Sequence, residues 1–401
     1  MSTAAARTGR PLAPVGVDGF FQPRRMAFWT MVFFIANGLF FEITQLLTGY
    51  RVVPTAVLLG LVLWTLYTVP VVLFFRSMDF FEQHPPLGFA MAFAWGGLGA
   101  TYLAIPANQA IFSLTAKLGG PAFGADWGAA FAGPTVEETL KILGVILLIL
   151  VARNQFPTVL SVVVIGATVG LGFQVLEDLS YSINTAASFP SGNEVQPVLL
   201  MFGVRGILDG IWSHAMYTSI SAFGVGYLLL RKHQAFARRL GVAVAAFVVA
   251  WGLHFFWNSP AFNDLGIFAG SLVKAIPVAV VGYLIYRLAG REEGGYLTVL
   301  AEHFVADDLV TTEERASLSS LRARRRVRKQ VGKDHGRKAA RAVRDLQRQQ
   351  VRLVMCHGRH GAGAELADHE YAVRRARARL DTLTGTRGEV SPATSDRHDP
   401  L

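Results

Sequence analysis

The sequence predicts an all-α, polytopic membrane protein: a bundle of about eight transmembrane helices followed by a basic, helical cytoplasmic tail. Of its 401 residues, 52% are hydrophobic and 16% are charged, whereas about 25% charged is typical of soluble domains. Apolar runs of about 20 residues, long enough to cross a bilayer as a helix, recur before residue 290. The lone cysteine, Cys356, excludes a disulfide within the chain.

The apolar runs place the membrane spans between short loops. We expect spans at residues 27–48, 52–75, 87–112, 128–152, 157–178, 203–230, 239–259 and 265–287. With these spans, nearly all Lys and Arg residues of the loops fall on one side of the bilayer, and the other side has only Arg51 and Lys117. On the basic side lie Arg24, Arg25, Arg76, Arg153, Arg231, Lys232, Arg238, Arg239, Arg287 and Arg291. The positive-inside rule therefore predicts a cell-membrane protein with both termini in the cytoplasm.

Changes in composition divide the chain further. We expect a cytoplasmic N-terminal segment (1–26), two leading membrane helices (27–86), a core of six membrane helices (87–290), a basic helical cytoplasmic domain (291–385) and a disordered tail (386–401).

The basic domain shows two helix signals. Thr311 and Glu314 have capping-box spacing, and a second helix is expected over 363–383. The run from Arg322 to Lys329 is expected to lie near anionic lipid headgroups, and no nucleic acid partner is expected on a membrane-tethered tail. Cys356, His357 and His360 offer too few ligands for a local metal site, so we interpret their spacing as chance.

The fourth predicted span carries charges at membrane depth, in the segment Glu137-Glu138-Thr139-Leu140-Lys141. A charge near the centre of a membrane helix costs about 2.5–3.5 kcal/mol on insertion scales, so the pair needs partners, protonation or water. Lys141 follows Glu137 by four residues and Glu138 by three, so it can bridge to either. We expect it to neutralise one carboxylate and to leave the other facing a cavity.

The next three spans also contain ionisable or amide side chains. Phe173, Glu177 and Tyr181 recur every four residues and share one helix face. Asp178 and Tyr181 are expected to be structural. Arg205 and Asp209 have the spacing of an i,i+4 ion pair, whereas His214 has no partner nearby in the sequence.

His254 and Asn258 lie one turn apart in the seventh span. Counting about 1.5 Å per residue along helices of alternating direction places Glu137, Glu177, His214, His254 and Asn258 in the outer half of the membrane. Side chains of this kind at one depth indicate a shared site, although each alone could simply hydrogen-bond between helices.

Four motifs on consecutive predicted spans resemble those of the PrsW family of intramembrane proteases in their spacing, order and helix placement. They are Glu137-Glu138-x-x-Lys141, Phe173-x-x-x-Glu177 with Tyr181, His214, and His254-x-x-x-Asn258. The resemblance covers roughly residues 90–285. The PrsW family looks distantly related to the CAAX prenyl endopeptidases, whose fold is a helical bundle. Asp178 departs from the pattern, in which we associate asparagine with this position.

The resemblance implies hydrolysis of a peptide bond within or beside the membrane. Glu137 or Glu138 would be the general base, and either remains open. His214 and His254 would orient the water, or would bind a divalent metal such as zinc together with Glu177. Asn258 would donate to the oxyanion. Lys141, Phe173, Glu177 and Tyr181 would have supporting roles.

The resemblance also implies a membrane-anchored protein substrate, cut near the outer face in a site-1-type cleavage, as for anti-sigma factors. Two other classes of function fit a polar membrane bundle. One is a proton-coupled secondary transporter, although we find no repeat between the two halves of the chain. The other is a noncatalytic membrane scaffold, although no key Glu or His is missing.

Overall fold

The computed structural model describes residues 19–78, 86–190, 192–210, 213–360 and 364–385. Every regular element within these ranges is a helix, as the sequence predicts. The described chain forms two compact units, the first ending at Glu293 and the second beginning at Gly294.

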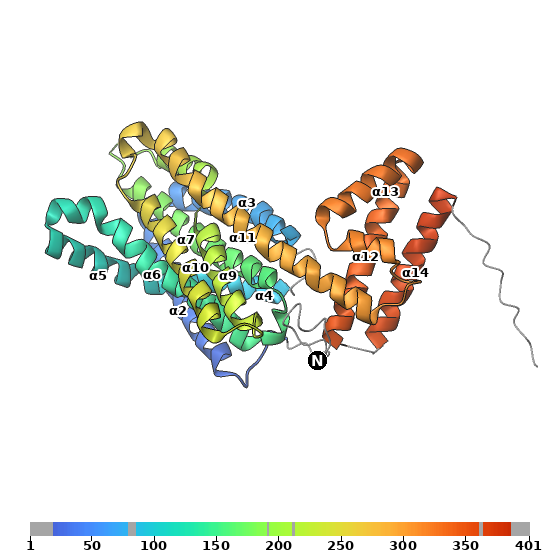
Figure 1. Ribbon diagram of the computed structural model, residues 1–401. Coiled ribbons are helices and arrows are strands. Elements are labelled where there is room, and N and C mark those ends of the chain that lie inside the picture. Colours follow the sequence, from blue (N-terminus) through green and yellow to red (C-terminus); the bar gives the residue numbers. More distant parts are fainter. Residues whose placement is uncertain (1–18, 79–85, 191, 211–212, 361–363, 386–401) are drawn as a thin grey trace, which may run out of the picture. The chain divides into compact units, whose positions relative to one another are not determined.

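The first unit is a helical bundle arranged around one central helix, α7 (Figure 1). In the most apolar window of α7, 94% of the residues are buried, against 17% in the windows of α2, α3 and α10. In chain order the elements are α2 (Met26–Val52), α3 (Pro54–Met78), α4 (Pro86–Ala94), η1 (Trp95–Ala100), α5 (Thr101–Gly119), α6 (Pro121–Val151), η2 (Arg153–Gln155), α7 (Val159–Ala187), α8 (Val195–Met201), η3 (Phe202–Leu208), α9 (His214–Leu230), α10 (Phe236–Asn258), η5 (Asn263–Leu265) and α11 (Gly266–Phe304).

Glycines allow the central helix to approach its neighbours closely. A Cβ atom on Gly170 of α7 would lie 2.2 Å from the backbone oxygen of His214 at the start of α9. One on Gly172 would lie 2.1 Å from the backbone oxygen of Phe93 in α4. Small residues at helix contacts let backbones meet inside a membrane. Gly170 thus lets the start of α9, and with it His214, lie against α7.

Six helical stretches of the described chain are long and apolar enough to cross a membrane, so this is a multi-pass membrane protein. They are Met26–Val52, Pro54–Met78, Pro86–Gly119, Val159–Ala187, Phe236–Asn258 and Asn263–Phe304. The predicted span at 128–152 lies in the 31-residue helix α6, which carries Glu137, Glu138 and Lys141. The total of eight spans remains a prediction.

The predicted continuous span at 203–230 is wrong in one respect, because the structure divides it. A π-helical segment, η3, ends at Leu208, and α9 begins only at His214. The Asp209 N–H donates to the Val204 oxygen, five residues back. In such a turn residues four apart no longer stack. The predicted Arg205–Asp209 ion pair is therefore also wrong: Arg205 turns to α7 instead.

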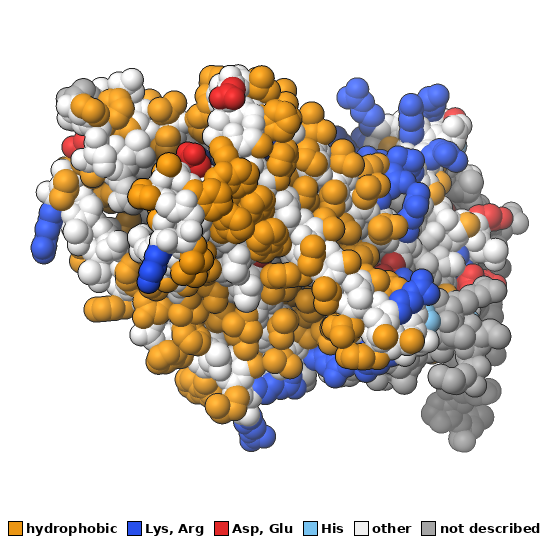
Figure 2. Space-filling view, turned by 60° about the vertical axis from the view of Figure 1, so that its left-hand side comes forward, with side chains coloured by type: hydrophobic (Ala, Val, Ile, Leu, Met, Phe, Trp, Pro, Cys, Tyr) orange, Lys and Arg blue, Asp and Glu red, His pale blue; other side chains and the backbone are white. Residues whose placement is uncertain are grey.

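The outer surface of the first unit is strongly apolar. Figure 2 shows hydrophobic side chains forming a broad surface over its helices, interrupted by few charged groups. Large side chains such as Phe40 of α2 and Leu66 of α3 are more than 60% exposed. Exposed apolar area of this kind is costly in water but is expected against lipid.

The second unit contains the end of α11 and helices α12 (Thr312–Leu318), α13 (Leu321–His360) and α14 (Ala364–Thr384). The predicted capping box is confirmed, since Thr311 and Glu314 bond reciprocally at the start of α12. The helix predicted at 363–383 is confirmed as α14. Residues 1–18 and 386–401, which belong to the predicted terminal segments, lie outside the described residues.

The helices of the second unit enclose a small core of their own. Leu346, Val354 and Val373 are buried there, and Arg377 of α14 pairs with Glu314 of α12 at 2.7 Å. Within the basic run of α13, Arg325 and Arg326 are exposed. Cys356 is buried.

Candidate active site

Helix α6 brings three charged groups into the interior of the bundle. Glu137 is 4% exposed, and Glu138 and Lys141 are fully buried. The Lys141 Nζ lies 2.6 Å from Glu138 Oε1 and 3.8 Å from Glu137 Oε2. It also lies 4.6 Å above the ring of Phe173. Lys141 thus neutralises chiefly Glu138, as the sequence pattern suggests for one of the two carboxylates.

His254 of α10 is fixed by Glu138. Its Nδ1 lies 2.8 Å from Glu138 Oε1, and its ring stacks on Tyr217 at 4.8 Å. A carboxylate accepts hydrogen bonds, so Nδ1 is the donor and the lone pair of a neutral ring lies on Nε2. That nitrogen lies 3.9 Å from Glu137 Oε2.

His214 of α9 is held in the same way by Glu177 of α7. The His214 Nε2 lies 3.1 Å from Glu177 Oε2, and its Nδ1 lies 2.8 Å from the Lys141 Nζ. Because the ammonium can only donate, the His214 lone pair lies on Nδ1. This nitrogen is 3.7 Å from Glu137 Oε2.

Arg205 of η3 completes this half of the site. It donates to Glu177 Oε2 at 2.6 Å and also to Asp178 Oδ1. Its guanidinium lies 4.1 Å above the ring of Tyr181.

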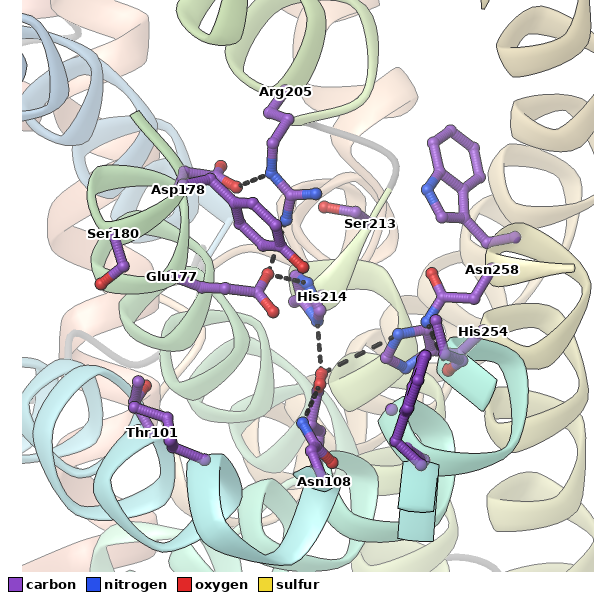
Figure 3. A pocket seen from close by; sticks show the side chains of 18 of the residues that line it. Thr101, Asn108, Glu177, Asp178, Ser180, Arg205, Ser213, His214, His254 and Asn258 are labelled. Carbon is purple, nitrogen blue, oxygen red and sulfur yellow. Dashed lines mark hydrogen bonds and ion pairs between the residues drawn. The ribbon is translucent and has the colours of Figure 1, made fainter. Parts of the chain in front are cut away.

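Three acceptor groups converge at the centre of the site, from Glu137, His214 and His254. One ligand atom from each lies within 4.8 Å of the others, and Figure 3 shows both histidines pointing into the same space. Glu137 Oε2 is buried without a hydrogen-bond partner. The orphaned Glu137 oxygen lies beside the free Nε2 lone pair of His254 and beside His214 Nδ1, which accepts from Lys141 here and would have to release that bond to hold a metal. Two His and one carboxylate are a common ligand set of catalytic zinc. These residues therefore fit a divalent metal.

The metal set predicted from the sequence differs by one residue from this group. The sequence indicated Glu177 with the two histidines, whereas the convergent carboxylate here is Glu137. Glu177 and Glu138 instead hydrogen-bond the far nitrogens of the two rings. A carboxylate that accepts a hydrogen bond from the ring nitrogen facing away from a metal fixes the tautomer of a metal-binding histidine.

A cavity of about 550 Å³ opens onto this centre. Glu137, Glu177, His214, His254 and Asn258 line it, whereas Glu138 and Lys141 do not. The Asn258 amide donates to the backbone oxygen of Ala129 at 3.2 Å. Tyr181 lines the same cavity. The structure thus brings all the predicted site residues into one region, with Glu138, Lys141 and Phe173 behind its wall.

Several residues of the site are missing from the sequence-based prediction. Asn108 of α5 donates to Glu137 Oε1 at 2.9 Å. Tyr217 lines the cavity, and its hydroxyl is buried without a partner. A Cβ on Gly133 would lie 2.7 Å from Asn258 Nδ2 and 3.4 Å from His254 Nε2. Only Gly133, directly before the helix-interior Pro134, carries a sequence signal that could have marked it.

Comparison with known proteins agrees with this geometry. A family model described as PrsW family intramembrane metalloprotease matches residues 84–287, which include every group of the central cluster but neither α2 nor α3. No curated protein and no solved structure matches the chain. The resemblance found in the sequence is confirmed, and the match indicates an intramembrane protease. The chain belongs to the PrsW family of intramembrane metalloproteases.

Proposed function

We propose that the chain hydrolyses a peptide bond of a membrane-anchored protein substrate with water activated between Glu137, His214 and His254. The observation that carries the proposal is the unsatisfied Glu137 Oε2, which lies 3.7 Å and 3.9 Å from one nitrogen of each histidine. Glu137 borders the cavity, so water and a substrate carbonyl can reach this oxygen.

The two adjacent glutamates have different roles in this proposal. Glu138 does not line the cavity, and its Oε1 is held by both Lys141 and His254. It is a positioning residue, which keeps the His254 Nε2 lone pair directed toward Glu137. Glu137 is the base, because it meets the cavity and keeps an uncommitted oxygen.

A divalent metal would be held by Glu137, His214 and His254, and zinc suits this ligand set. With a metal bound, Glu137 would be a ligand through Oε2, so its role as the base belongs to the metal-free form of this proposal. Bound there, the ion would lower the pKa of water toward about 7 and would polarise the substrate carbonyl. Glu177 and Glu138 would then orient the two histidines through their far nitrogens.

The protein groups account for the movement of protons. Glu137 takes a proton as the water oxygen bonds to the carbonyl carbon. Asn258 and Tyr217 line the cavity and can donate to the resulting oxyanion. Glu137 then returns the proton to the departing nitrogen as the C–N bond breaks, which leaves a carboxylic acid and an amine.

The side of cleavage follows from the charge bias of the loops. With both termini in the cytoplasm, the site lies toward the outer face. A single-span protein with an extracytoplasmic segment, such as an anti-sigma factor, fits this geometry. The exposed arginines of α13, among them Arg325 and Arg326, would meet anionic headgroups of the inner leaflet.

The test is cleavage of single-span substrates by the full chain in proteoliposomes. We expect Glu137→Gln to lower kcat/KM by about 10²–10⁴-fold, the usual range for a general base. Bound metal should fall in a His214→Ala, His254→Ala double variant, measured by elemental analysis of the purified protein. Unchanged cleavage by Glu137→Gln would overturn the proposal. The matched control, Asp126→Asn, neutralises an exposed acid of the same helix that lies outside the cavity.

A further inference from the structure

Helix α2 presents a buried carboxyl group to the interior of the bundle. Gly38, Glu42 and Gly49 recur at helical spacing and share one face. A Cβ on Gly38 would lie 2.2 Å from the backbone oxygen of Leu98, and one on Gly49 would lie 2.9 Å from the Ile183 side chain. Glu42, between them, is 7% exposed. This face of α2 therefore packs on η1 and α7.

Glu42 borders a second cavity, of about 180 Å³, next to the active-site cavity. Gln45, Ser180 and Asn184 line both cavities. The two cavities are therefore adjacent along α7. Glu42 belongs to α2, which lies outside the stretch that matches the family.

Glu42 also lies at the depth of the active site. It is ten residues before the last residue of α2, Val52, and Glu177 is ten residues before the last residue of α7, Ala187. At 1.5 Å per residue both lie about 15 Å from the ends of their helices.

Glu42 differs electrostatically from the acids of the active site. Glu137 and Glu138 lie within 4 Å of Lys141, and Glu177 and Asp178 have Arg205. Glu42 has no hydrogen bond or ion pair with any described residue, and no Lys or Arg lines its cavity. A buried carboxyl group without a partner is unfavourable unless something else supplies a donor.

We infer that the Glu42 cavity is a specificity subsite that takes a lysine or arginine side chain of the substrate, near the scissile bond. This inference rests on the proposed function of the neighbouring site. The flexible stem of a basic side chain suits the apolar wall formed by Leu46 and Ile183, and its charged end would meet Glu42. Gln45 and Asn184, which line both cavities, add polar groups where the two adjoin.

The experiment uses single-span substrates that carry Lys, Gln or Glu at successive positions beside the cleavage site, with the full chain in proteoliposomes. At one position we expect the native chain to prefer Lys over Glu by about tenfold in kcat/KM. Glu42→Gln should remove the preference, and Glu42→Lys should reverse it toward Glu. A reversal distinguishes recognition from a purely structural role, because a misfolded variant loses all substrates alike.

Binding of the same substrates to the Glu137→Gln chain separates this inference from the proposed function. If affinity follows the charge at residue 42, the subsite stands whether or not cleavage depends on Glu137. If cleavage depends on Glu137 but all residue-42 variants keep the native substrate preference, the subsite is overturned and the protease mechanism survives. Asp126→Lys, on the exposed face of α6, is the control for charge reversal outside the cavities and should leave the preference intact.

Discussion

The two halves of the active site use the same groups in different settings. In the α6–α10 half, Lys141 neutralises Glu138, which fixes His254. In the α7–α9 half, Arg205 of η3 neutralises Glu177, which fixes His214. Each half thus has one cation, two adjacent acids and one imidazole. The side chains of Lys141 and Glu138 are 0% exposed, whereas those of Arg205 and Glu177 are 26% and 19% exposed.

This difference indicates a division of roles. In the α6–α10 half, the Lys141–Glu138 pair behind His254 is fully buried and does not line the cavity, so breaking this ion pair is costly. The open half borders the cavity through Glu177 and Arg205, so water can replace a lost partner and a substrate can reach these groups. The predictions below test that division.

The largest expected effect is on stability when each cation is removed. Lys141→Met leaves Glu138 buried without its cation and should lower the free energy of unfolding by about 3–5 kcal/mol. Arg205→Met should cost less, about 1–3 kcal/mol, because Arg205 and Glu177 are 26% and 19% exposed, even though its other partner, Asp178, is buried. Unfolding in detergent or bicelles measures both. Equal losses would show that the two halves do not differ in solvation.

The next effect concerns the carboxylates behind the histidines. Glu138→Gln and Glu177→Gln should each weaken binding of a divalent metal by about 10–100-fold, because each orients an imidazole. The loss should be larger for Glu138, which has no contact with the cavity. Titration of the metal-free protein with zinc, with Asp126→Asn as the control, measures it. A larger loss for Glu177 would instead support the ligand set expected from the sequence.

Close packing in each half gives a third test. Gly170→Ala would press on the backbone of His214, and overpacking of this kind costs about 1–3 kcal/mol of stability. Gly133→Ala meets the side-chain amide of Asn258 instead, so cleavage should fall more than stability. Thermal unfolding and kcat distinguish the two. Gly252→Ala in α10, where a Cβ would meet nothing within 4 Å, should change neither.

The smallest effect is expected at Tyr181, whose ring lies beneath Arg205 at 4.1 Å. Tyr181→Leu should cost about 0.5–1 kcal/mol of stability, and Tyr181→Phe less, because the ring face is kept. Chemical denaturation of the two variants measures the difference. A loss of several kcal/mol would mean that Tyr181 holds the open half together.

The same comparison explains how much could be predicted from the sequence. In the buried half, Lys141 and its glutamates lie three and four residues apart on one helix, so local spacing identifies the pairing. In the open half, Arg205 reaches acids 27 and 28 residues away. The sequence-based prediction instead paired Arg205 with Asp209, because i,i+4 spacing applies to a regular α-helix, whereas the chain forms a π-helical segment here.

Other groups of the site depend on tertiary packing alone. Asn108 meets Glu137 only because α5 and α6 lie side by side, and Tyr217 meets His254 across two helices. Neither residue stands out in an apolar segment. The membrane class and the helix content, by contrast, follow from hydropathy, which depends little on tertiary context.

The burial of α7 also limits how proteins of this architecture can diverge. A helix that is buried along most of its length has few positions that tolerate a larger side chain, and each substitution there requires compensating substitutions in several neighbouring residues. Peripheral helices such as α2 face lipid on one side and have more room to vary. New substrate preferences would therefore arise most readily at the rim of the bundle, while the interior keeps the chemistry unchanged.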